Sequence, residues 1–277
     1  MRAVPGHPGE ALLHGGITNA GLVSRVGETV RRPQRPKSPA THALLEHLER
    51  VGFEGAPRFL GIDDRGREVL SFIPGEAAIA PYQDWALGDE ALVSVAELLR
   101  RYHDAVASFD PTGHDWPPSV PSAFQDGVIS HNDPNLDNVI FAGERAVALI
   151  DFDLASPGSV EWDVACAARL WAPLRDDSDM PGRLRGRSLA RLRMFVDAYG
   201  LPGRERARVV DAAVHTHDWC YDIVRDAVAD GHETFGRIWR EGGRMRADRT
   251  RDWLAAQGPQ MRAALSTSTE VRRPWGS

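Results

Sequence analysis

Apolar and polar residues alternate over short stretches in the first part of the chain, which is typical of strands that bury one face. Residues 11 to 33 contain two such stretches, GLVSRV and ETVRR, joined by a tight turn at Val26-Gly27-Glu28. Residues 56 to 76 contain two more, around the turn Asp63-Asp64-Arg65-Gly66. Between the pairs, THALLEHLERVGF has apolar residues at helical spacing. The pattern therefore predicts a small β-rich lobe that ends near Pro74-Gly75.

Beyond residue 75 the apolar residues recur mostly at helical spacing. ALVSVAELLRRYHDAVASF and VEWDVACAARLWAPL each carry one apolar face. Four more helix candidates follow, over residues 186–200, 203–230, 232–241 and 244–265. One short hairpin interrupts the helices, with strands NVIF and AVALIDF around Ala142-Gly143-Glu144. We therefore predict an α+β fold with a small β-rich lobe over residues 1–75 and a larger, mainly helical lobe over residues 76–277.

The composition narrows the class of protein. The 277 residues carry a net charge of −6, which argues against nucleic-acid binding because nucleic-acid-binding domains usually have a basic surface. No run of about 18 apolar residues occurs, so we expect no membrane-spanning helix and no membrane partner. The chain has two cysteines, Cys166 and Cys220, and its first residues lack the apolar core of a signal peptide. These features predict a cytoplasmic protein and leave its oligomeric state open.

Small polar side chains cluster in the segment SHNDPNLDNVIF. The spacing is His131-x-Asp133-x-x-x-x-Asn138, and Asp151-Phe152-Asp153 follows after one hairpin. Phosphoryl transfer needs such groups, because one carboxylate must orient the accepting hydroxyl and take its proton. A second carboxylate and an amide oxygen are suitable ligands for magnesium, which prefers oxygen. Since the hairpin returns the chain, we expect Asp133, Asn138 and Asp151 to face one cleft.

The order of these residues resembles the catalytic and metal-binding loops of kinases, H-x-D-x-x-x-x-N followed by an aspartate at a strand end. Asn132 replaces the arginine that usually follows the histidine, and IDFDLASPGSVEWDVA stands where protein kinases have a longer activation segment. In both respects the chain is similar to the aminoglycoside/choline phosphotransferase family, which has the protein-kinase-like fold. The resemblance extends from about Leu12 to the helices near residue 265 and is strongest from Val128 to Leu174.

This resemblance implies a role for each residue of the motif. Asp133 would be the catalytic base, while Asn138 and Asp151 would bind the Mg²⁺ that accompanies ATP. Three further residues would support this site: His131, Asp153 and Asp163. Of these, the histidine would anchor the loop, the first aspartate would assist the metal or the acceptor, and the second would bind backbone amides of the loop.

In the first lobe, the resemblance implies a nucleotide site with two parts. The segment HGGITNAG would cover the phosphates, since glycines let backbone N–H groups approach an anion. Its candidate residues are Gly15, Gly16 and Asn19. A hinge would meet the edge of the adenine through backbone groups, and its residues are Ser71, Phe72 and Ile73.

The cation that normally pairs with the phosphates is a lysine in this family, and here ETVRR offers Arg31 or Arg32 instead. Strand alternation puts Thr29 and Arg31 on one face, so we favour Arg31. The glutamate that usually pairs with this cation would fall near Thr41 or His42, and neither is acidic. An arginine is always charged and offers a fork to phosphate, so it would need less support from such a partner.

The resemblance therefore implies an enzyme that moves the γ-phosphate of ATP to a hydroxyl of a small molecule. A cationic acceptor, such as an aminoglycoside, would need an acidic pocket. The helices after residue 200 offer Asp218 and Asp222 for this, interleaved with aromatic residues, although the same pattern is typical of an ordinary amphipathic helix. Choline, amino-alcohol, sugar, macrolide and peptide-antibiotic acceptors all remain open.

Two other classes of function remain open. The first is a catalytically silent kinase-like protein that binds a nucleotide or ligand, which the departures at Arg31 and His42 favour. Retention of the three motif residues argues against it. The second is a metal hydrolase that uses His131, Asp133 and Asp151, but further histidines at ligand spacing are lacking. His215 and His217 lie two residues apart on a predicted helix, so they face different sides and make a poor metal pair.

Overall fold

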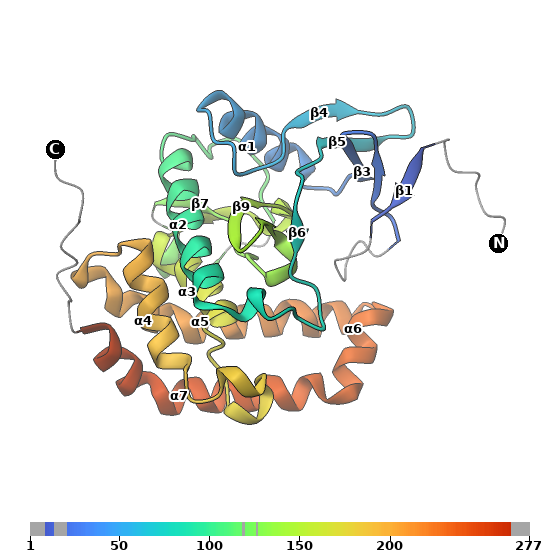
Figure 1. The fold of residues 1–277 in the computed structure, drawn as a ribbon. Coiled ribbons are helices and arrows are strands. Elements are labelled where there is room, and N and C mark those ends of the chain that lie inside the picture. Colours follow the sequence, from blue (N-terminus) through green and yellow to red (C-terminus); the bar gives the residue numbers. More distant parts are fainter. Residues whose placement is uncertain (1–8, 14–20, 118–119, 126, 267–277) are drawn as a thin grey trace.

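The computed structural model describes residues 9–13, 21–117, 120–125 and 127–266. Strands gather with one helix at one end of the molecule, and the remaining helices form the other end (Figure 1). This arrangement confirms the predicted α+β class with a small β-rich lobe and a larger helical lobe. The chain passes from one to the other after residue 71, at the end of strand β5. The boundary at residue 75 between two domains stays a prediction.

The smaller lobe is built on a five-stranded antiparallel sheet with the order β1-β2-β3-β5-β4. The strands are β1 (Glu10–Leu12), β2 (Ser24–Val26), β3 (Thr29–Pro33), β4 (Phe59–Ile62) and β5 (Arg67–Ser71). Strands β3 and β5 pair so that Arg32 lies opposite Glu68, and Val30 lies opposite Leu70. Because side chains alternate along a strand, these four residues share one face of the sheet.

Helix α1 (Ser38–Arg50) packs beside this sheet. Its leucines Leu44, Leu45 and Leu48 are fully buried, as their helical spacing predicts. The helix begins a few residues before the predicted stretch, because a proline lies in its first turn. Proline suits that position, since the first N–H groups of a helix have no partner within it.

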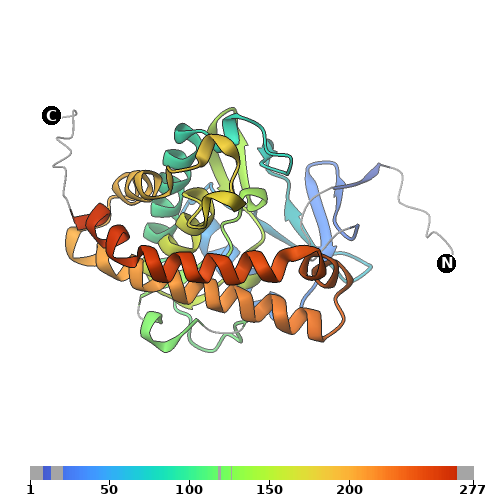
Figure 2. The ribbon, with the colours of Figure 1, turned by 90° about the horizontal axis from the view of Figure 1, so that it is seen from below.

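The larger lobe consists of helices that stack under the hairpin. They are α2 (Asp89–Val106), α3 (Val160–Trp171), α4 (Ser188–Tyr199), α5 (Gly203–Ala229), α6 (Glu233–Ile238) and α7 (Arg244–Ser266). Helices α5 and α7 run side by side along the base of the molecule (Figure 2). A π-helical turn, η7 (Trp239–Gly243), joins α6 to α7, and Gly242 breaks the helix there with a φ of 92°. The predicted helices are confirmed, since each has a counterpart within a few residues.

Five short strands frame the segment that carries the motif. The predicted hairpin is confirmed as β8 (Val139–Ala142) and β9 (Arg145–Leu149), and β6 (Glu76–Ala77) adds to its edge. Strands β7 (Val128–Ser130) and β10 (Ser156–Gly158) pair with each other on either side of the motif. The 3-10 turns η1 to η6 are Trp85–Leu87, Ser122–Phe124, Leu136–Asn138, Phe152–Leu154, Asp177–Asp179 and Gly182–Leu184.

One hydrophobic core extends through both lobes. Leucines of α1 and Leu70 of β5 belong to the same buried cluster as Tyr102 of α2 and Phe152 beside the motif. The two lobes therefore pack as one body, because burial of apolar surface stabilises their contact. None of the helices in the described part of the chain is long and apolar enough to cross a membrane.

Candidate active site

The loop that carries the motif is anchored by Asp163, which is 0% exposed. This residue lies in the first turn of α3, just after Ser159 caps the helix by accepting a hydrogen bond from Trp162 N. Its carboxylate accepts hydrogen bonds from the backbone N–H groups of His131 (2.7 Å) and Asn132 (2.9 Å). The loop is therefore held to α3 by the carboxylate–amide contacts that the resemblance implied.

A third donor completes this anchor. Nε2 of His103, on α2, lies 3.0 Å from Oδ2 of Asp163. Burial alone would raise the pKa of the Asp163 carboxyl, but the bonds to His103 and the charges nearby hold that pKa below its ordinary value. Asp163 is therefore ionised at neutral pH and binds the loop through charge-assisted hydrogen bonds.

Asn132 turns the chain within the loop. Its φ is 67°, a left-handed conformation that asparagine tolerates better than most residues. Its side chain donates to Leu154 O (2.7 Å) and Ser156 Oγ (2.9 Å), and it accepts from Trp162 Nε1 (2.8 Å). The residue that replaces the usual arginine is therefore a structural element that joins the loop to β10 and α3.

His131 is fully buried and orients the base. Its Nε2 lies 3.1 Å from Ile150 O, to which it donates, and its Nδ1 accepts from Asp133 N at 3.3 Å. Burial lowers the pKa of His131 to about 4, so the ring is neutral at physiological pH. Its ring packs 4.6 Å from that of Phe152. Both nitrogens are thus used in shaping the loop, which agrees with an anchoring role.

The side chains of Asp133 and Asn138 meet directly. The amide nitrogen of Asn138 donates to Asp133 Oδ2 and to Asp133 O, both at 3.0 Å. Because the amide is planar, its oxygen then faces away from Asp133 and is available as a ligand. Burial, followed by the charges of Asp151 and Asp137, raises the pKa of Asp133 to about 7, while Arg169 opposes the shift.

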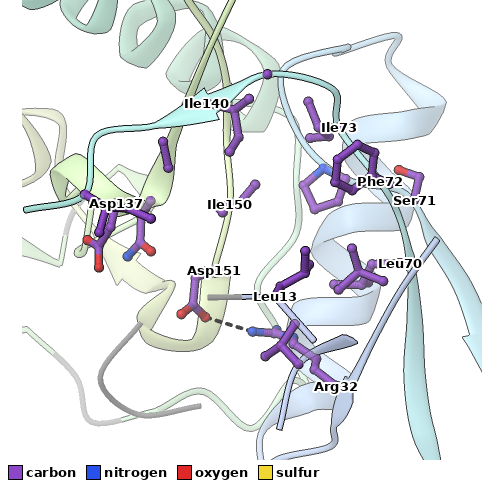
Figure 3. Close-up of a pocket in the computed structure, with 17 residues that line it drawn as sticks. Leu13, Arg32, Leu70, Ser71, Phe72, Ile73, Asp137, Ile140, Ile150 and Asp151 are labelled. Atoms are coloured by element: carbon purple, nitrogen blue, oxygen red, sulfur yellow. Dashed lines mark hydrogen bonds and ion pairs between the residues drawn. The ribbon is translucent and has the colours of Figure 1, made fainter. Parts of the chain in front are cut away.

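Asp151 reaches the same place from β9. Ile150 N donates to Asn138 O (2.9 Å), which holds the end of β9 beside the loop. Asp151 itself has a φ of 61°, a strained conformation for a residue other than glycine. Asp151 and Asn138 both line one pocket between the lobes (Figure 3). Asp133 does not line this pocket and is joined to it through the hydrogen bond from Asn138, so a single cleft shared by all three groups stays a prediction.

Arg32, and not Arg31, reaches this pocket. Its guanidinium donates to Asp151 Oδ1 (2.8 Å) and to Asp153 Oδ1 (2.7 Å), as Figure 3 shows for the first contact. Burial lowers the pKa of Arg32, but Asp153, Asp151 and Glu68 raise it above its ordinary value. Arg32 is therefore a permanent cation held between the two lobes, and Arg35 adds a second ion pair with Asp153 at 2.9 Å.

Arg31 lies away from the pocket, which argues against the preference for it. Its side chain donates to Thr29 Oγ1 (2.7 Å) and lies 3.8 Å from Asp63, and it does not line the pocket. The apolar residue Val30 marks the inward face of β3, and Arg32 shares that face two residues further on. The polar Thr29 was therefore the wrong guide to the face, and Val30 was the signal that could have corrected it.

Glu68 of β5 supplies the acidic partner that helix α1 lacks. It lies opposite Arg32 in the sheet, is 0% exposed and forms an ion pair with Arg32 Nε. Its other oxygen lies 2.7 Å from Nε2 of His42, whose ring stacks on Phe59 at 3.7 Å. The sequence held one clue, because Glu68 is a charged residue on the strand face that also carries Leu70.

The pocket has a volume of about 290 Å³ and a mostly apolar wall. The predicted hinge residues Ser71, Phe72 and Ile73 line it together with Leu13, Val23, Val30, Leu70, Ile79, Ile140 and Ile150. The N–H groups of Ser71 and Phe72 already donate to Arg58 O and Glu28 O, both at 2.9 Å. Among the described residues no acceptor is found for Ile73 N–H, which makes it the free hinge donor. Gly15, Gly16 and Asn19 lie outside the described residues.

The two aspartates expected to bind a cationic acceptor are each paired with an arginine. Asp218 lies 2.9 Å from Arg251, and Asp222, which is largely exposed, lies 2.5 Å from Arg225. Neither lines the pocket. Each negative charge is therefore already paired with an arginine, and a role of Asp218 and Asp222 in acceptor binding stays a prediction.

Metal binding is limited to a small set of oxygen donors. Within the described part of the chain, no group of three or more His, Cys, Asp and Glu side chains could hold a metal ion. The amide oxygen of Asn138 and the carboxylate of Asp151 do fit magnesium, which usually takes one or two protein oxygens and completes its shell with water and phosphate.

Known proteins are similar to this chain over different shares of its length. The model of the phosphotransferase enzyme family, APH, matches residues 114–210. The trifolitoxin immunity protein of Rhizobium leguminosarum bv. trifolii is 33% identical over 266 residues, which cover 92% of this chain and 98% of that protein. The homoserine kinase of Rhodopseudomonas palustris is 32% identical over 131 residues, which cover 47% of this chain and 34% of that protein.

Solved structures share the fold at lower identity. A choline/ethanolamine kinase family protein from Mesorhizobium loti superposes with a TM-score of 0.60 at 16% identity, over 90% of each chain. An aminoglycoside phosphotransferase from Alicyclobacillus acidocaldarius superposes with a TM-score of 0.54 at 14% identity, over 95% of this chain and 98% of that one. With the motif, its geometry and a relative that matches almost end to end, the chain belongs to the APH phosphotransferase enzyme family.

Proposed function

We propose that this protein transfers the γ-phosphate of ATP to a hydroxyl group of a small molecule, with Asp133 as the base. The observation that carries the proposal is the contact of Asn138 with Asp133 on one side and the pocket it shares with Asp151 on the other. A hydroxyl beside Asp133 and a phosphate beside Asp151 would then lie within reach of each other, and positioning supplies much of the catalysis in such reactions.

The nucleotide would occupy the pocket between the lobes. Its apolar wall suits a purine ring, and the free N–H of Ile73 would bind the ring edge, as one polar contact commonly fixes orientation in an apolar site. Arg32 would face the phosphates from β3, since it is the cation that lines the pocket beside Asp151. Glu68 and His42 would hold its guanidinium in place from behind.

Asn138 and Asp151 would hold magnesium through their side-chain oxygens. When bound, the ion would neutralise charge on the phosphates during transfer. One oxygen of Asp151 is 2.8 Å from Arg32, so the arginine would share that carboxylate with the metal. This arrangement differs from a dedicated metal cage but agrees with the small number of protein ligands that magnesium needs.

Asp133 would accept the proton of the acceptor hydroxyl. The acceptor oxygen would form a bond to the γ-phosphorus as the bond from that phosphorus to the bridging oxygen breaks, leaving ADP. Burial raises the pKa of Asp133 to about 7, which suits a base that operates near neutral pH. Asn138 would keep the carboxylate pointed at the hydroxyl, because its amide binds Oδ2.

The acceptor class is a small alcohol. The names of the homoserine kinase and of the choline/ethanolamine kinase family protein describe kinases of such compounds. The trifolitoxin immunity protein, which matches this chain almost end to end, is named for protection against a toxin. Phosphorylation of a toxin's hydroxyl would serve such a role with the same chemistry.

ATP consumption tests the proposal against a silent binding protein. Purified protein with ATP and Mg²⁺ is incubated with a panel of hydroxylated acids, amines and sugars, and ADP release is measured. We expect release that depends on one acceptor class and disappears in Asp133→Ala. ATP binding without acceptor-dependent release across the panel would favour the silent alternative.

A further inference from the structure

Two half-buried arginines at the end of α3 have no carboxylate partner among the described residues. Arg169 lies in the last turn of α3, and Arg175 follows the end of that helix. In the part of the chain that the structure describes, neither has a carboxylate oxygen within 4.0 Å. Other arginines of similar or deeper burial are each paired with a carboxylate: Arg32, Arg67, Arg191, Arg206 and Arg249. The two arginines are therefore exceptions in a chain that otherwise balances its buried cations.

The hydrogen bonding of Arg169 is incomplete. Its Nη2 donates to Cys220 Sγ of α5 at 3.1 Å, and a thiol sulfur is a weak acceptor. Its Nε is fully buried and has no hydrogen-bond partner among the described residues. A buried donor without an acceptor is costly, and more so when it carries charge. The guanidinium of Arg169 is therefore charged but is not balanced by any carboxylate among the described residues.

The end of α3 lies beside the catalytic loop. Trp171 Nε1 donates to the carbonyl oxygen of Pro134 at 2.9 Å, and Pro134 directly follows Asp133. The charge of Arg169 reaches the base, since it opposes the rise of the pKa of Asp133. Both Arg169 and Asp133 also affect the pKa of Cys220, which burial raises. The last turn of α3, which carries Arg169, therefore contacts the catalytic loop directly after Asp133.

Arg175 directly follows the turn that ends α3, where Leu174 N donates to Arg169 O at 3.1 Å, and it brings a second positive charge. Burial, followed by the like charge of Arg169, lowers the pKa of Arg175, and Tyr82 and Asp179 oppose this shift. Both oxygens of Asp179 bind Arg249, at 2.8 and 3.1 Å, and Asp179 forms no ion pair with Arg175. Two half-buried arginines that lack a carboxylate partner among the described residues offer positive charge to an anion.

We propose that Arg169 and Arg175 form a carboxylate-binding site for the acceptor, so that the enzyme phosphorylates a hydroxy acid rather than a cationic amino alcohol. The inference rests on the proposed function, because it takes the hydroxyl of the same molecule to lie against Asp133. An arginine fork matches the two oxygens of a carboxylate. Fixing that end of the acceptor would orient the hydroxyl toward the base.

Three acceptors of equal chain length test this charge preference. They are 4-hydroxybutyrate, 1,4-butanediol and 4-amino-1-butanol, which differ only in one end group. The dissociation constant of each is measured by NMR titration of the intact protein with Mg²⁺ and a non-hydrolysable ATP analogue. We expect 4-hydroxybutyrate to bind about tenfold or more tightly than the other two, as a charge-assisted pair requires. Equal binding of the three, or tighter binding of the amine, overturns the proposal.

Variants assign the preference to the two arginines. Arg175→Gln should remove most of the preference for 4-hydroxybutyrate, and Arg175→Lys should keep part of it. Arg169→Gln should act like Arg175→Gln, with folding checked by circular dichroism. Arg183→Gln is the matched control, because Arg183 is exposed and pairs with Asp84 on the surface. An unchanged preference in Arg175→Gln overturns the assignment.

The nucleotide gives a further readout. Affinity for the ATP analogue should stay within about twofold of wild type in Arg175→Gln, because the arginines face the acceptor. A loss of nucleotide affinity with no change in acceptor binding would instead assign them to the phosphates and contradict the proposal. A failure of the proposed function alone would give a different result. The acid would still bind preferentially, but no acceptor would increase ADP release.

Discussion

The surroundings of Asp133 raise the pKa of its carboxyl group and so oppose its ionisation. Burial, Asp151 and Asp137 raise its pKa to about 7, and Arg169 lowers it in part. A general base works as the carboxylate, so the active form is lost as the pH falls below the pKa of Asp133. The charges near Asp133 therefore set the pH range in which the enzyme is active. Two of these neighbours raise the pKa of Asp133, and one lowers it.

Two substitutions of these neighbours should shift the pKa of Asp133 in opposite directions. Asp137→Asn removes a negative charge, so the pKa should fall, while Arg169→Gln removes a positive charge, so it should rise. Carbon-13 NMR titration of the carboxyl group in metal-free protein measures both shifts. Shifts of the same sign, or none in either variant, would contradict this description of the site.

The two adjacent arginines of β3 should differ sharply in function. Arg32→Lys and Arg32→Met should raise the KM for ATP, by about tenfold or more for the methionine, since a charge-assisted contact with phosphate is lost. Arg31→Met should change it by less than about twofold, because Arg31 contacts Thr29 and Asp63 outside the pocket. Steady-state kinetics with varied ATP make the comparison. The opposite ranking would restore Arg31 as the phosphate ligand.

At the scale of elements, the catalytic loop depends on α3. Asp163 receives two backbone N–H groups of the loop and Nε2 of His103. Because folding lowers the pKa of Asp163, its contribution to stability is fully present above the unfolded value of about 3.9. It is lost as the pH falls through the lower folded value. The link between loop and helix is thus strong at neutral pH and weak in acid.

Asp163→Asn tests this link. We expect the free energy of unfolding at pH 7 to fall by about 3 kcal/mol or more, as when one partner of a buried charged network is removed. Urea denaturation measures the change, with Asp226→Asn on exposed α5 as the control. The difference between wild type and variant should shrink at pH 3, and a difference that stays constant with pH would contradict the role of the charge.

Long elements could be read from the sequence, and three of the short ones could not. Helices α2, α4, α5 and α7 follow the spacing of their apolar residues, because each is long enough to show a period. Strands β6, β7 and β10 have two or three residues, too few for an alternation to appear. Their pairing depends on residues distant in sequence, such as Ser130 opposite Ser156.

Some features of the candidate site could likewise be predicted from the sequence, and others could not. The spacing of Asp133, Asn138 and Asp151 was visible because a single hairpin brings them together. The partnership of Arg32 with Glu68 depends on strand register across the sheet, which sequence alone does not fix. Asp218 and Asp222 each form a salt bridge with an arginine, and the sequence alone did not show that these negative charges are paired.

For the whole molecule, the fold class was predictable because apolar spacing changes from strand-like to helical near residue 75. One core nevertheless joins the lobes, and Arg32 crosses between them to reach Asp151 and Asp153. Its cation is thus placed where a nucleotide between the lobes would present its phosphates. The central claim is that this junction binds nucleotide while Asp133 performs the transfer.

Separate measurement of binding and turnover in two variants tests that claim most directly. Calorimetric titration with Mg²⁺ and ATP, together with kcat, is measured for Asp133→Ala and Asp151→Ala. Asp133→Ala should bind nucleotide within about threefold of wild type while kcat falls by about a hundredfold or more. Asp151→Ala should lose both affinity and turnover, since its carboxylate lines the nucleotide pocket. Wild-type turnover in Asp133→Ala, or loss of nucleotide binding in that variant alone, would contradict the account.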